Sequence, residues 1–153
     1  MGKIFDAVTT FLKEDGWPVR RIGKDLAYSV TFEGENGEWA CVAQVVEEEN
    51  LFLFYSACPV AAPPERRAAA EELLNRINFN LKVGDFEMDL ADGHIRFRTS
   101  LDVTGHTPGA LLINQVVYTN VLSMDKYLPF IKAVLEGTMT PADAAAAAAK
   151  QEG

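Results

Sequence analysis

The fold is decided by residues 63–98, PPERRAAAEELLNRINFNLKVGDFEMDLADGHIRFR. The first half predicts an amphipathic helix, because it opens with proline, which suits a first helical turn, and then repeats apolar residues at helical spacing. These apolar residues are Ala70, Leu73, Leu74, Ile77 and Leu81. After Gly84, apolar and charged residues alternate as they do on a strand. The stretch therefore predicts a helix that leads directly into a β-hairpin.

The turn of this hairpin is predicted at Asp92-Gly93, a pair that favours a two-residue type I′ turn. Such a turn pairs Leu90 with Ile95 on the buried face. On the other face it sets opposite charges directly across from each other, which stabilises paired strands. The charged pairs are Asp89 with Arg96 and Glu87 with Arg98.

The meander before this stretch is predicted from a second turn pair. Residues 26–33 alternate between apolar and polar side chains, and Asn36-Gly37 favours a two-residue turn after them. That turn places Phe32 opposite Cys41. A further reversal at Glu49-Asn50 places Cys58 beside Cys41, Leu53 beside Val46 and Tyr55 beside Gln44.

The strand predicted over residues 51–58 is apolar on both faces, so it needs cover on both sides of the sheet. The residues that need cover on the side away from the helices are Val42, Val46, Leu53 and Tyr55. Two covers fit: another part of this chain, such as the first helix or the tail, or a second protein. Because exposed apolar patches commonly mark interaction sites, we take these four as candidate partner-binding residues.

Helices are also predicted near both ends of the chain. Residues 3–14 carry an apolar stripe, and a short edge strand follows at residues 19–22. Residues 110–136 predict a long helix, which Pro129 is expected to kink or split. The alanine-rich residues 138–153 have strong helix propensity but nothing large to pack, so we expect a mobile or partner-dependent tail.

This order predicts an α+β domain over residues 1–137, with an antiparallel sheet and helices packed on one face, followed by the tail at 138–153. The net charge of −8 argues against nucleic acid as a partner. No apolar run is long enough to span a membrane and no secretion signal is apparent, so we expect a cytoplasmic protein. The two cysteines fit reduced thiols.

No set of residues predicts an enzyme, a metal site or a cofactor. His94 and His106 lack the spacing of zinc ligands. Cys58 precedes a predicted helix start, so a catalytic thiol is an alternative, but a buried packing cysteine is more common. Asn78, near the end of the central helix, is interpreted as a tie between that helix and the adjoining strand.

Together these residues resemble the YbjN domain family of bacterial proteins. The resemblance rests on Gly16-Trp17, Asn36-Gly37-Glu38-Trp39, Leu51-Phe52-Leu53-Phe54-Tyr55-Ser56, Arg76-Ile77-Asn78-Phe79-Asn80, Gly84-Asp85-Phe86-Glu87 and Asp92-Gly93 through Arg96-Phe97-Arg98-Thr99. It implies a fold like that of type III secretion chaperones, with the element order α-β-β-β-α-β-β-α. Members are described as sensory-transduction regulators, and secretion chaperones of this shape are dimers that bind extended partner segments.

The leading hypothesis is therefore a non-enzymatic, homodimeric protein-binding module, chaperone-like or regulatory, with a protein partner of unknown identity. The alternative is a sensor that binds a small ligand between the sheet and the kinked C-terminal helix. The fold alone does not decide between them, because one fold supports many functions.

Overall fold

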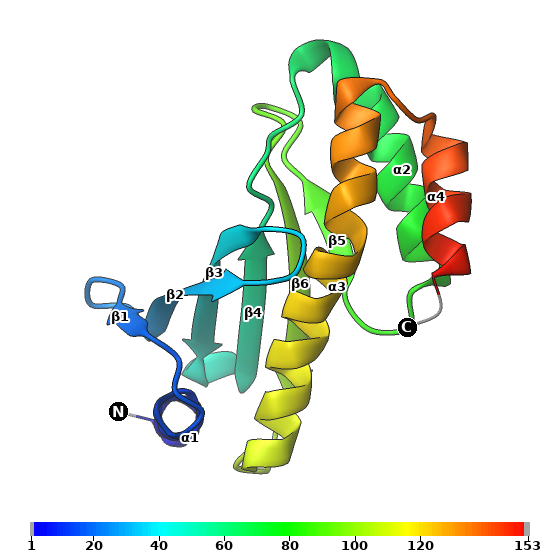
Figure 1. The fold of residues 1–153 in the computed structure, drawn as a ribbon. Coiled ribbons are helices and arrows are strands. Elements are labelled where there is room, and N and C mark those ends of the chain that lie inside the picture. Colours follow the sequence, from blue (N-terminus) through cyan, green and yellow to red (C-terminus); the bar gives the residue numbers. More distant parts are fainter. Residues whose placement is uncertain (1, 152–153) are drawn as a thin grey trace.

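In the computed structural model, which describes residues 2–151, a six-stranded antiparallel sheet has the order β1-β2-β3-β4-β6-β5 (Figure 1). The strands are β1 (Val19–Arg21), β2 (Ala27–Glu33), β3 (Glu38–Val46), β4 (Leu51–Ala57), β5 (Asp85–Met88) and β6 (Ile95–Asp102). The helices are α1 (Lys3–Glu14), α2 (Arg67–Asn80), α3 (Ala110–Glu136) and α4 (Pro141–Lys150), with short 3-10 turns at Glu47–Glu49 and Pro64–Arg66. The predicted α+β class and the rough element order are confirmed, including the short edge strand β1, and α4 adds a last helix.

All three predicted hairpin registers are wrong by two residues, because each turn is longer than the sequence suggested. In the β2–β3 hairpin the turn holds four residues, and the Gly34 N–H donates to the Gly37 carbonyl at 2.8 Å. The observed pairs are Phe32 with Trp39, Cys41 with Ser56 and Phe86 with Phe97. A slip of two residues keeps the side chains within the strands on their predicted faces, because successive side chains alternate between faces. Leu90 is the exception, since it was predicted to pair with Ile95 on the buried face but lies beyond the end of β5 and is exposed.

The long β2–β3 turn is held from outside by α3. The Asp125 carboxylate accepts the backbone N–H groups of Glu35 at 3.0 Å and Asn36 at 2.8 Å, and the Asn36 amide donates to the Asp125 carbonyl at 2.9 Å. A tighter turn would lose these bonds. The register of this hairpin therefore depends on a residue almost ninety positions away.

The helix α3 lies across the sheet in Figure 1 and forms the centre of the core. Its fully buried Asn120 donates from Nδ2 to the Phe54 carbonyl at 2.8 Å and the Phe97 carbonyl at 3.0 Å, which ties the helix to β4 and β6. The helix continues as one element through Pro129, so the expected split does not occur.

The alanine-rich segment is packed, contrary to the expectation of an unpacked tail. The helix α4 lies against α2 and α3, and Ala144 and Ala148 are buried there. Small side chains let the helix backbones approach closely, so no large apolar residue is needed. Thr140 caps α4, since its hydroxyl accepts the Asp143 N–H at 3.1 Å. The division of the chain at residue 137 stays a prediction.

Candidate partner-binding face

The two faces of the sheet differ in burial, residue by residue. On β4, Phe52, Phe54 and Ser56 are fully buried beneath the helices, whereas the residues between them are partly exposed. The same alternation runs along β3. The partly exposed side belongs to the surface away from the helices, which we call the open face.

The four residues predicted to bind a partner all lie on the open face, and all are partly exposed: Val42, Val46, Leu53 and Tyr55. Their neighbours differ from the prediction, because the β3–β4 register is shifted by two residues. Val42 pairs with Tyr55, Gln44 with Leu53, and Val46 with Leu51. Leu51 therefore joins the apolar strip, on the same face of β4 as Leu53 and Tyr55, because residues two apart on a strand share a face.

The β6 side of the open face is bordered by ion pairs. The Arg96 guanidinium lies 4.4 Å above the centre of the Tyr55 ring and bonds Glu87 at 2.7 Å. Arg98 is 3.1 Å from Glu87 and 3.9 Å from Asp85. Partial burial raises the pKa of the Asp85 carboxyl, and Arg98 opposes that rise. The predicted charge pair between Glu87 and Arg98 thus forms, as a diagonal contact.

The opposite border of the open face is acidic. Glu33 at the end of β2 lies directly across from Glu38 at the start of β3. Like charges directly opposite each other in an antiparallel pair are destabilising unless a cation lies near them. Across the apolar strip, the β6 side therefore carries arginines that are paired with Glu87 and Asp85, and the other side carries this acidic pair together with Arg20 of β1, which pairs with Ser29.

The chain's own helices leave this face open. The helix α1 packs on the other face, where Phe5 stacks on Tyr28 with ring centres 5.1 Å apart. The helix α4 packs on α2 and α3. Neither of the internal covers considered from the sequence, the first helix or the tail, therefore lies over Leu53 and Tyr55.

The β5 edge of the sheet is closed by a side chain. The Asn78 amide donates to the Phe86 carbonyl at 3.0 Å, and the Phe86 N–H donates to the Asn78 Oδ1 at 2.8 Å. This pair of bonds imitates a neighbouring strand and confirms that Asn78 ties the helix end to the adjoining strand. A partner strand cannot pair with Phe86 without displacing it, so docking is favoured on the face and not on this edge.

The chemistry of the cysteines does not favour a nucleophile. Burial raises the pKa of the Cys58 thiol, although nearby Lys132 and a bond with the Val60 backbone oppose the rise. A catalytic thiol needs the reverse, a stabilised thiolate. Within residues 2–151, no three His, Cys, Asp or Glu side chains are grouped so as to hold a metal ion. The expectations of no enzyme activity, metal or cofactor stay predictions.

The space proposed for a small ligand, between the sheet and α3, is filled by side chains. Val117, Val121 and Met124 have no exposed surface there. An open hollow of about 920 Å³ lies instead beside α3, between the β2–β3 turn and the end of α4, where Glu35, Leu122 and Lys150 line it. A ligand site between the sheet and the C-terminal helix would need this core to open.

Comparison with known proteins points to one family. The family model YbjN, "Putative bacterial sensory transduction regulator", matches residues 5–133. The fold is similar to a structure described as "Crystal structure of YbjN, a putative transcription regulator from E. coli", with a TM-score of 0.56 and 14% identity, covering 80% of this chain and 89% of that one. No curated protein matches the sequence. Across residues 2–151, none of the helices has the length and apolar character needed to cross a membrane.

Proposed function

Because the chain belongs to the YbjN family of bacterial regulators, we propose that it is a non-enzymatic protein-binding module that forms a homodimer through the open face. The observation that carries this proposal is the apolar strip of Val42, Val46, Leu51, Leu53 and Tyr55, which none of the chain's own helices covers. Burying such a strip against a second copy removes apolar surface from water, which is the main force in most protein associations.

The charges on the two borders favour a second copy as the occupant. A two-fold axis running along β4 would place the β6 side of one copy over the β3 side of the other. Arg96 and Arg98 would then approach the acidic pair of Glu33 and Glu38 in the other copy, in addition to their own partners Glu87 and Asp85. One surface would thus supply both halves of a complementary interface.

Exposed apolar side chains elsewhere would serve a further protein partner in a chaperone-like way. Phe79 is 87% exposed and Leu122 is 58% exposed, which is unusual for large apolar residues. Both lie outside the open face, so a dimer would keep them accessible. The proposal places this activity in the cytoplasm, where the free thiols of Cys41 and Cys58 stay reduced.

Light scattering after size exclusion tests the homodimer. We expect the wild-type chain to elute with twice the monomer mass and Tyr55→Glu to elute as a folded monomer, because the change replaces an apolar ring of the strip with a carboxylate that must lose its water on burial. Leu111→Glu is the matched control, since Leu111 is 70% exposed at the start of α3, and it should leave the dimer intact. A wild-type monomer at the highest soluble concentration, or a dimer that Tyr55→Glu leaves unchanged, would contradict the proposal.

A further inference from the structure

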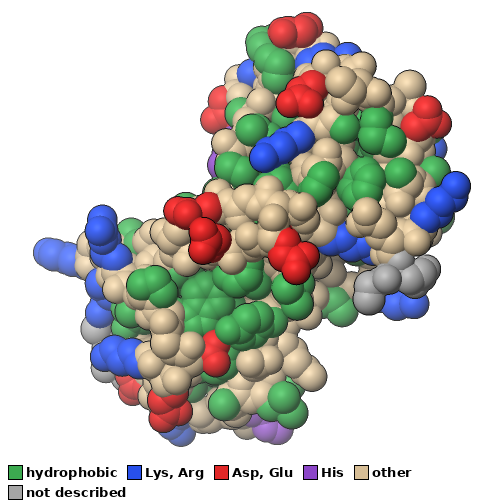
Figure 2. Space-filling view, viewed as in Figure 1, with side chains coloured by type: hydrophobic (Ala, Val, Ile, Leu, Met, Phe, Trp, Pro, Cys, Tyr) green, Lys and Arg blue, Asp and Glu red, His purple; other side chains and the backbone are tan. Residues whose placement is uncertain are grey.

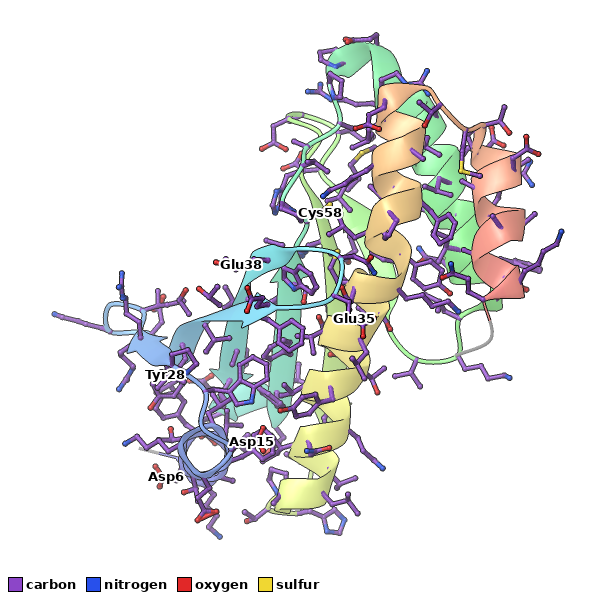
Figure 3. All side chains as sticks on the ribbon, viewed as in Figure 1. Asp6, Asp15, Tyr28, Glu35, Glu38 and Cys58 are labelled. Atoms are coloured by element: carbon purple, nitrogen blue, oxygen red, sulfur yellow. The ribbon has the colours of Figure 1, made fainter. Side chains whose placement is uncertain are left out.

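A second hollow, of about 220 Å³, lies on the helix side of the sheet, where the α1–β1 loop meets β2 and α3. Its lining includes the aromatic side chains of Trp17, Phe32 and Tyr118 together with Asp15. We call these four residues the aromatic recess. In Figure 2, hydrophobic side chains gather in this part of the surface with an acidic side chain among them, and Figure 3 shows Asp15 between α1 and α3.

The three rings pack against one another along one side of the recess, and Trp17 is almost buried there. The ring centres of Trp17 and Phe32 are 5.7 Å apart in a stacked arrangement, and those of Trp17 and Tyr118 are 5.8 Å apart and edge-on. Two of these rings are also held by core residues, because Trp17 packs edge-on against Phe54 and Phe32 lies against Trp39. The recess is therefore built on the core and keeps its shape without a ligand.

The Asp15 carboxylate is held at the recess by two of its walls. The Trp17 indole N–H donates to Oδ2 at 2.9 Å, and the Tyr118 hydroxyl donates to the same oxygen at 2.5 Å. Burial, and next the bond to Asp15, raise the pKa of the Tyr118 hydroxyl, so it stays a donor at neutral pH. Within residues 2–151, no lysine or arginine forms an ion pair with Asp15.

Aromatic rings beside a fixed carboxylate attract an organic cation, because the ring faces carry negative potential and the carboxylate supplies a full charge. A volume of about 220 Å³ suits a headgroup and falls below the range of drug-sized pockets. We propose that the aromatic recess binds a methylated ammonium group. The four residues of the aromatic recess lie on the helix side of the sheet, and Glu33, which also lines the hollow, belongs to the acidic pair of the open face.

Nuclear magnetic resonance titration of the full chain with choline tests the site. We expect saturable shifts of the Trp17 indole N–H signal. The neutral isostere 3,3-dimethyl-1-butanol, at matched salt, should bind at least about tenfold more weakly, since it has the same shape and no charge. Equal binding of the two compounds, or shifts spread over the whole spectrum without saturation, would overturn the proposal.

Two variants separate charge from shape. Asp15→Asn keeps an acceptor for Trp17 and Tyr118 and should weaken choline binding by about tenfold. The control Glu14→Gln removes the adjacent exposed carboxylate and should leave binding unchanged. If Asp15→Asn fails to fold, Phe32→Leu replaces it and should weaken choline more than the neutral isostere. Choline binding that survives both Asp15→Asn and Phe32→Leu in folded protein would overturn the assignment.

A binding experiment with peptides shows whether the ammonium group belongs to a protein side chain or to a small molecule. A short peptide with trimethyllysine is compared with its unmethylated form and with free choline. Tighter binding of the methylated peptide than of choline supports a protein side chain as the ligand, and tighter binding of choline supports a small molecule. Preference for the unmethylated peptide would overturn the proposed methylated ammonium group.

Discussion

The two faces of β4 use the same kinds of residue for different purposes. Phe52 and Phe54 are fully buried beneath the helices, while Leu53 and Tyr55, between and beside them in sequence, are partly exposed on the open face. Hydrophobicity alone does not separate the two pairs. The helix-covered face stabilises the chain by itself, and the open face holds apolar surface that folding of one chain leaves unused.

The two faces should differ most in how much a substitution lowers the free energy of unfolding at neighbouring positions of β4. Phe54→Ala should lower the free energy of unfolding by about 3–5 kcal/mol, because it leaves a cavity in a packed core. Leu53→Ala should cost about 1 kcal/mol or less when the chain is dilute, because its side chain is already partly in water. Urea unfolding at several protein concentrations measures both. An equal, concentration-independent loss at the two positions would show that the open face is covered.

A second test concerns the polar contact at the centre of the covered face. Asn120→Ala should lower the free energy of unfolding by about 1–3 kcal/mol, because Nδ2 bonds to Phe54, Phe97 and Thr99 are lost in a buried site. The Asn120 Oδ1 has no hydrogen-bond partner among residues 2–151, so part of that cost is offset on removal. Asn75→Ala, on the exposed side of α2, is the control and should change stability little. Equal effects of the two variants in thermal unfolding would contradict the role given to Asn120.

The smallest expected effect is the pH dependence of the covered face. Burial raises the pKa of the Cys41 thiol from 9.0 to about 12, a rise that Ser56 and Trp39 oppose. The folded chain keeps this proton where the unfolded chain loses it, so the contribution is complete below pH 9 and is lost as the pH rises toward 12. Between pH 8 and pH 10, the wild type should lose about 1.4 kcal/mol more than Cys41→Ala. Parallel stability curves for the two proteins would show that Cys41 is not buried as described.

The sequence was sufficient for what depends on local pattern. The bounds of α1 and α3 follow from their apolar stripes, and strand alternation assigned the residues of the β3–β4 hairpin to their correct faces. The length of the β2–β3 turn could not be predicted from local pattern, because Asp125 holds this turn from the distant helix α3. The packing of α4 was also missed, since its partners are α2 and α3 and its own residues are almost all alanine.

The candidate site divides in the same way. The four apolar residues of the open face could be identified from a strand that is apolar on both sides. The contact between Arg96 and Tyr55 could not, because it depends on which residues of β4 and β6 are neighbours. The aromatic recess joins the α1–β1 loop, β2 and α3, so only the folded chain brings Trp17, Phe32 and Tyr118 together.

The amide of Asn78 has a consequence for how large an assembly can grow. With its hydrogen bonds to Phe86 in place, the β5 margin of the sheet offers an incoming strand no free backbone groups at that residue. In the homodimer that we propose, association through the open face would end at two copies, because a closed two-fold pair uses up the surface that formed it. A chain with an apolar sheet face would in this way form one closed pair and would not grow into fibres through that face.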